Sequence, residues 1–302
     1  MAGPRTTIFL SIPFMIIGFL LSRAPYNMVS YAPTKQWADG PMDLIATPQF
    51  QTKKTDIFTA GATHMALLHN SILRGYNSIY HQAPIVADSD KADFVGYALT
   101  WYKFVKSHHD DEEQTLFTKI EDLLEDKNIF EETHKEHDSF LGGLAEFEKY
   151  LSGLKSPADF SGEELVGIMK KFQEPFKNHF HSEISTIAKF ADHPKAPKAG
   201  TPEEAAASAT FKAWGKATVT KAGVLDVVPF FLLNLDRTIE DGLWANWPPM
   251  PAPIKWGLIN LAGAWHSGWW KFASCDAAGQ PRELWAFQAA DLRAQRETAN
   301  KA

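Results

Sequence analysis

Cysteine and clustered positive charge are what this 302-residue sequence most clearly lacks. Its single cysteine, Cys275, cannot form an internal disulfide and excludes thiolate-rich zinc or iron–sulfur sites. The net charge of −6 and the absence of a basic patch argue against nucleic acid as a partner. With 45% apolar and 13% aromatic residues the chain can bury a core, which excludes wholesale disorder, collagen-like repetition and a coiled coil. Histidine is plentiful instead, and nine of the eleven lie between His64 and His181.

An uncharged, mostly apolar run occupies residues 7–22, between Arg5 and Arg23. We interpret residues 1–24 as an N-terminal hydrophobic segment that inserts into a membrane, as a secretory signal or as an anchor. A buried helix docked on the domain is the alternative. The expected location is therefore a membrane or the secretory pathway, or the cytoplasm if the run is not inserted.

The rest of the chain divides into three parts. Residues 25–55 carry Pro, Gly and polar residues without periodicity, which is typical of a linker or a wrapped arm. Residues 56–192 contain four long helical patterns with short connections, which predicts an all-α fold, an up-down four-helix bundle. The patterns span about residues 56–81, 92–124, 129–154 and 161–190. Residues 193–302 are rich in Trp and Pro and predict additional C-terminal helices packed on the bundle.

Two of these predicted helices carry a His four residues before a Glu: His108 with Glu112, and His179 with Glu183. Residues four apart lie on one face of a helix, and imidazole plus carboxylate on one face suits iron, manganese or zinc. The pair His108/Glu112 lies on or beside the apolar stripe that faces the bundle interior. A buried, unpaired carboxylate is costly there, and coordination to a cation is one of the few ways to keep it charged.

A rival pair on the same predicted helix, His109 and Glu113, is almost as well placed, and periodicity does not choose between the two. A dinuclear site needs ligands from the other helices as well. His69 lies on a mainly apolar surface of the first predicted helix, and His137 on the inner face of the third. Four antiparallel helices that project ligands inward predict a dinuclear metal site in the bundle core. We expect the remaining histidines of this region to lie beside the ligands or on the surface: His64, His81, His109 and His181.

Four motifs resemble the hemerythrin-like (HHE cation-binding) domains, in particular fungal members. They are HNSILRGYNSIYHQA on the first predicted helix, HHDDEEQTLF on the second, EHDSFLGGLAEF on the third and HFHSE on the fourth. The resemblance covers about residues 56–190 and favours His108/Glu112 over its rival. It implies two iron ions, with manganese or zinc as alternatives, and two bridging glutamates. The implied ligands are His69, His108, Glu112, His137, His179 and Glu183.

The third predicted helix departs from the oxygen-carrying hemerythrins. Those have two histidines four residues apart, whereas His134 and His137 are three apart, so His134 is a possible additional ligand. The resemblance implies a di-iron protein that binds iron and dioxygen, or another small diatomic ligand. The alternative is an O2-dependent di-iron oxidoreductase or oxygenase acting on a small apolar organic substrate, with fungal secondary metabolism as one setting. Residues 227–270 then form a pocket wall, a second helical layer or a membrane-surface segment.

Overall fold

The computed structural model describes residues 36–301. The apolar run at residues 7–22, predicted to enter a membrane, lies outside the described residues. Within residues 36–301 the structure is helical, and its β-structure is limited to an isolated bridge between Cys275 and Pro281. The predicted all-α fold class is therefore confirmed.

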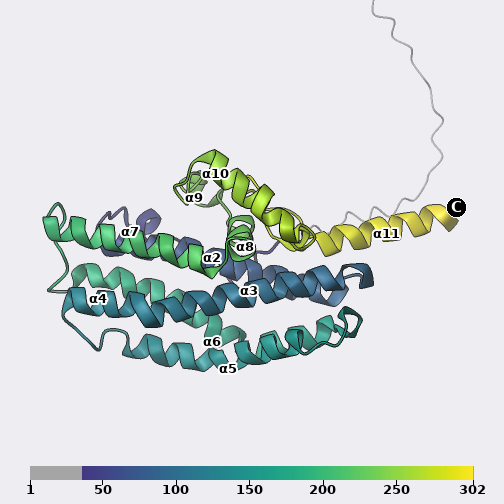
Figure 1. The fold of residues 1–302 in the computed structure, drawn as a ribbon, viewed down its shortest axis with the longest axis horizontal. Helices are drawn as coiled ribbons and strands as arrows, with labels where there is room; N and C mark the ends of the chain where they lie inside the picture. The colour runs from purple at the N-terminus through teal and green to yellow at the C-terminus, as the bar shows by residue number, and fades with distance from the viewer. Residues whose placement is uncertain (1–35, 302) are drawn as a thin grey trace, which may run out of the picture. The chain divides into compact units, whose positions relative to one another are not determined.

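Four long helical segments form a bundle (Figure 1). They are α2 (Ile57–Gln82), α3 (Lys91–Asp111) with its continuation, α5 (Glu131–Ser152) and α6 (Gly162–Lys189). The continuation of α3 is a π-helical turn (Glu112–Leu116) followed by α4 (Phe117–Leu124). α6 packs against α2 and α5, and α3 packs against the same two helices, which closes a ring of four. The bundle predicted from the helical patterns is thus present.

Local sequence signals set where these helices begin. Asp56 caps α2, because its Oδ1 accepts hydrogen bonds from the backbone N–H groups of Phe58 and Thr59 at 3.1 and 2.9 Å. Ser161 caps α6 in the same way, accepting from the N–H of Glu164 at 3.2 Å. These caps fix the ends of the two helices that carry most of the interior packing.

The polypeptide before α2 wraps along the outside of that helix and includes the short helix α1 (Pro48–Thr52). Two asparagines of α2 hold it: the N–H of Met42 donates to Asn77 Oδ1 at 2.9 Å, and the N–H of Ile45 donates to Asn70 Oδ1 at 2.7 Å. All four residues are buried. In the structure the described part of this segment is a wrapped arm, not a free linker.

Aromatic side chains fill the interior of the bundle. Trp101, Phe172 and Phe176 are among the largest fully buried side chains. Trp101 Nε1 donates to the carbonyl of Ile72 at 3.0 Å, so its one polar atom is satisfied. This packing excludes water from the space between the helices, which fixes the environment of any polar group placed there.

A second helical layer follows the bundle in sequence. It consists of α7 (Pro202–Ala222), α8 (Val227–Asn234), α9 (Ile239–Gly242), α10 (Ala252–Gly257), the turns at Leu258–Ala262, Gly263–His266 and Trp269–Phe272, and α11 (Trp285–Lys301). Every residue of α8 is buried against α2 and α3, so for α8 the second-layer interpretation holds. No single helix within residues 36–301 has the length and apolar composition to span a bilayer, although α7 and α8 meet both criteria jointly as a bent pair.

Candidate metal centre

Four imidazoles and two carboxylates meet in the interior of the bundle. Their residues come from every helix of the ring: His69 from α2, His108 from α3, Glu112 from the π-helical turn, His137 from α5, and His179 and Glu183 from α6. Each of the six is at most 3% exposed. The structure therefore brings together all six side chains that the sequence selected as candidate ligands.

The histidines are arranged as two pairs. His69 Nε2 lies 2.9 Å from His108 Nε2, and His137 Nε2 lies 3.1 Å from His179 Nε2. In each pair the two Nε2 atoms point at each other across the gap between two helices. Neutral imidazole nitrogens aimed at one point are the donor arrangement that a transition-metal ion uses. Each pair can thus serve one ion.

Glu112 lies between the two pairs. Its Oε1 is 3.0 Å from His108 Nε2, and its Oε2 is 3.9 Å from His137 Nε2. One carboxylate oxygen therefore faces each histidine pair, which is the geometry of a carboxylate that bridges two cations.

Glu183 makes the matching contacts from the opposite helix. Its Oε2 lies 3.4 Å from His69 Nε2 and 3.8 Å from His179 Nε2. Neither oxygen of Glu183 has a hydrogen-bond partner, and Glu112 Oε1 also lacks one. Buried acceptors without donors cost several kcal/mol unless a cation or a proton meets them. The donor set of four nitrogens and two carboxylates fits a pair of cations of the iron, manganese or zinc type.

Burial sets the charge state of the cluster. It raises the pKa of Glu112 and of Glu183 well above the usual range, and the second carboxylate adds to the rise at Glu183. Burial also lowers the pKa of His69 well below its ordinary value, lowers that of His179, and brings that of His108 to about 4. At neutral pH the imidazoles are therefore neutral and ready to bind. The two carboxyl groups hold protons to a higher pH than an exposed glutamate does, so cations compete with protons for them.

Hydrogen bonds on the outer side orient two of the imidazoles. His69 Nδ1 donates to the carbonyl oxygen of Phe180 at 3.1 Å. His179 Nδ1 donates to Glu136 Oε2 at 3.3 Å, and the same oxygen accepts from Ser182 Oγ at 2.6 Å. An acceptor at Nδ1 fixes the tautomer that leaves Nε2 free for a metal. Nothing in the sequence pattern singled out Glu136, because its role depends on how α5 meets α6.

Glu113 performs the same task for His137. Its Oε1 accepts from His137 Nδ1 at 2.5 Å and from His134 Nδ1 at 2.9 Å. His134 is 44% exposed and points at Glu113, so the structure places this possible ligand outside the inner cluster. The rival pair from the sequence is thereby resolved by position: Glu112 faces the core, and Glu113 and His109 lie on the outer side of His137.

The distances also allow a second three-residue group, His109, Glu113 and His137, to share a cation. This group shares His137 with the core cluster and lies closer to solvent. Of the other histidines set apart in the sequence, His81 Nε2 donates to the carbonyl of Gly40 at 2.6 Å. His181 Nε2 contacts the carbonyl of Asp43 at 3.1 Å, and the ring of His64 lies beside that of Trp247.

A π-helical turn at Glu112–Leu116 begins at the first of the two neighbouring glutamates of the centre. Its hydrogen bond runs from the N–H of Phe117 to the carbonyl of Glu112, five residues apart rather than four. The extra residue in the turn changes the direction of the side chains that follow. Such insertions recur at functional sites. The ring of Phe117, the residue after this turn, stacks on His137, with centroids 5.7 Å apart.

Glu113→Gln is expected to weaken metal binding by about 10- to 100-fold without changing the number of ions bound at saturation. The neutral amide is a poorer acceptor for His137 Nδ1 and holds the imidazole less firmly. Competition against a chelator of known affinity measures the change. His134→Ala is the control, because His134 gives no atom to the inner cluster, and it should bind metal as the parent chain does. An unchanged affinity in Glu113→Gln, or equal losses in both variants, would contradict the orienting role of Glu113.

Comparison with known proteins agrees with this geometry. The family model described as the hemerythrin HHE cation binding domain matches residues 61–191. The dimeric xanthone biosynthesis cluster protein R11 of Cryptosporiopsis sp. (strain 8999) is 30% identical to this chain over 260 residues, which cover 83% of this chain and 93% of that protein. No solved structure matches.

Proposed function

Since this chain belongs to the hemerythrin HHE cation-binding family, we propose that its core cluster holds two iron ions and that the loaded protein is an O2-dependent oxidoreductase. Its substrate would be a small, largely apolar organic molecule of fungal secondary metabolism. The observation that carries the proposal is a donor set of four histidines and two glutamates, from which His134 is excluded.

This donor set leaves coordination positions unfilled. Each ion would receive two imidazoles and a share of two carboxylates, which is fewer donors than iron accepts. When bound, iron with open positions supplies the redox chemistry by which non-haem enzymes use dioxygen. An open position is needed both to bind dioxygen and to react with it, so this donor set is compatible with the proposed enzyme.

The chain's own residues hold the ligands and keep water out. The ring of Phe180 lies 4.3 Å from that of His69, and the ring of Phe140 lies 5.3 Å from that of His179. Phe117 covers the third imidazole, that of His137. Apolar rings on several sides lower the local dielectric, which strengthens the grip of the carboxylates on cations and admits apolar molecules more readily than charged ones.

The relative offers independent support. Its name assigns it to the biosynthesis cluster of a dimeric xanthone, that is, to the making of a secondary metabolite. The match covers 83% of this chain and 93% of that protein, so it extends beyond the bundle into the C-terminal layer. A shared role in building an organic product is a better explanation of this shared architecture than oxygen carriage.

Oxygen consumption by the iron-loaded protein tests the proposal. In an oxygen-electrode assay with an electron donor, xanthone and hydroxylated xanthones are added in turn as probes. We expect at least one to stimulate net oxygen consumption, with a modified product seen by mass spectrometry. Glu183→Gln should abolish the stimulated rate. Oxygen uptake that is fully reversible on degassing, and that no organic probe changes, would instead establish a carrier.

A further inference from the structure

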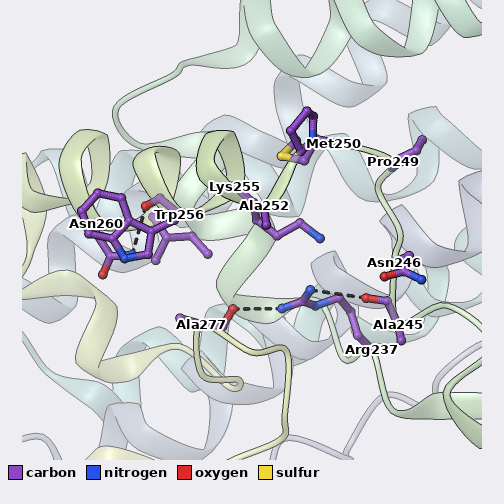
Figure 2. A pocket seen from close by; sticks show the side chains of 12 residues that line it. Arg237, Ala245, Asn246, Pro249, Met250, Ala252, Lys255, Trp256, Asn260 and Ala277 are labelled. Carbon is purple, nitrogen blue, oxygen red and sulfur yellow. Dashed lines mark hydrogen bonds between the residues drawn. The ribbon is translucent and has the colours of Figure 1, made fainter.

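A pocket of about 720 Å³ lies in the C-terminal layer (Figure 2). It is formed by α10, the turn after it and the segments around Arg237, Asn246 and Ala277. None of the six cluster residues lines it. α8 packs against α2 and α3 on one side and against the turn after α10 on the other, so the pocket is separate from the metal centre.

Two cationic side chains face this pocket without an anionic partner. Arg237 donates from Nη2 to the carbonyl of Ala277 at 2.9 Å and from Nη1 to that of Ala245 at 3.4 Å, both of which are neutral. Lys255 Nζ makes no hydrogen bond or ion pair with any described residue. Figure 2 shows both side chains extending into the same hollow. Burial, followed by the charge of Arg237, lowers the pKa of Lys255, as close like charges should.

The acids next to the pocket residues in sequence bond to other groups. Asp236, which precedes Arg237, accepts from the N–H and Oγ1 of Thr238, and Asp276 accepts from the N–H groups of Ala278 and Gln280. Neither Asp nor Glu occurs between Gly242 and Cys275, although the whole chain has 36 acidic residues. The lining of the pocket also contains none. The pocket wall thus carries a guanidinium whose N–H groups are not all used and an ammonium without a partner. Together they attract an anion, and a carboxylate can accept hydrogen bonds from both.

The rest of the lining is apolar and aromatic. Trp256 is 58% exposed, so much of its indole surface is uncovered, and Met250 and Ile259 contribute further apolar surface. A volume of this size falls in the usual range for small-molecule sites, about 300–1,000 Å³. An exposed indole in such a site offers a surface against which a planar ring stacks.

We propose that this pocket is a binding site for an aromatic carboxylate. Its carboxylate lies between Arg237 and Lys255, and its ring packs against Trp256. The site binds its ligand without reacting with it. This proposal does not depend on the iron chemistry proposed for the bundle.

Isothermal titration of the full-length protein with 2-naphthoate tests the site, with neutral 2-naphthamide as the matched probe. We expect naphthoate to bind at least about tenfold more tightly than the amide, the difference of one charge-assisted contact. Lys255→Gln should remove that preference, and Lys255→Arg should restore it. Trp256→Ala should weaken both probes by about threefold or more. Lys198→Gln, at an exposed lysine outside the pocket, is the control and should change nothing.

Several outcomes would overturn the proposal. They are the absence of naphthoate binding, equal affinities for the acid and the amide, and a naphthoate affinity that Lys255→Gln and Trp256→Ala leave unchanged. The last result would place the bound acid elsewhere, for example on the metal ions, while leaving the iron centre itself unquestioned. Since Lys255 and Trp256 are both partly exposed, we expect the variants to keep the fold, and a thermal melt checks this.

Discussion

Glu183→Gln is expected to weaken iron binding by more than about 100-fold, a larger loss than that for an outer hydrogen-bonding partner. The amide keeps the size of the side chain but removes the negative charge that faces both histidine pairs. Iron content after extensive dialysis, measured by elemental analysis, should fall well below that of the parent chain. Glu174→Gln is the matched control, because Glu174 is exposed on the same helix.

Although Glu183→Gln weakens iron binding, it should not lower the thermal stability of the metal-free protein. Without cations, the buried carboxyl group of Glu183 must either stay protonated or be ionised without a partner. The neutral amide avoids ionisation, so at pH 8 the metal-free variant should melt at or above the temperature of the metal-free parent chain. If Glu183→Gln retained full iron content, or destabilised the metal-free and loaded chains alike, Glu183 would not be a metal ligand.

Metal removal is expected to lower the melting temperature by about 10 °C or more at pH 8. A ligand at a thousandfold excess over its dissociation constant stabilises the folded state by about 4 kcal/mol. Each kcal/mol shifts the melting temperature of a domain of this size by about 2–4 °C. Scanning calorimetry of the loaded and chelator-treated chains gives the difference directly, and re-addition of iron should restore the higher value.

This difference should grow as the pH rises from about 4.5 towards the raised pKa values of Glu112 and Glu183. The carboxyl groups of Glu112 and Glu183 have pKa values raised well above 4.5 in the metal-free fold, so the folded chain holds protons that the unfolded chain has released. Metal-free stability therefore falls with increasing pH until those raised pKa values are passed. The cluster histidines, whose pKa values are lowered from 6.5, are neutral above that pH with or without metal and so add little to the difference there. A constant difference across the window would show that the two acids are not buried in the metal-free chain.

The helices and the inward-facing ligands were predictable because both depend on local spacing. His108 and Glu112 are four residues apart on or beside a stripe that contains Trp101, which predicted a His/Glu pair in the interior. The family resemblance then favoured this pair over His109 and Glu113. The same reasoning holds for His179 and Glu183. Burial of apolar residues and the helical repeat thus determined the fold and the main features of the centre.

The outer contacts were not predictable in this way. Glu113 and Glu112 were nearly equivalent by periodicity, and a π-helical turn begins at Glu112, which no regular repeat anticipates. Glu136 on α5 orients His179 on α6 because the packing of these two helices places the side chains opposite each other. His134, three residues before His137, remained open in sequence until its exposure and its bond to Glu113 placed it outside the cluster.

The C-terminal layer gave the weakest signal. The helices that line the pocket are short, and α10 continues into a π-helical turn. The sequence is therefore rich in aromatic residues there but shows no regular apolar stripe that would mark a buried helix face. One interpretation of the sequence was that residues 227–270 form the wall of a pocket over the bundle. The structure shows α8 buried as a second layer, and it places the pocket of Figure 2 on the layer's own residues, away from the cluster.

A crystal structure of the iron-loaded protein with anomalous scattering at the iron edge tests the central claim most directly. We predict two anomalous peaks in the bundle core, one bound by His69 and His108 and the other by His137 and His179. Glu112 and Glu183 should bridge them. A folded chain with no peak at these histidines, or with iron held only by surface carboxylates, would contradict the account.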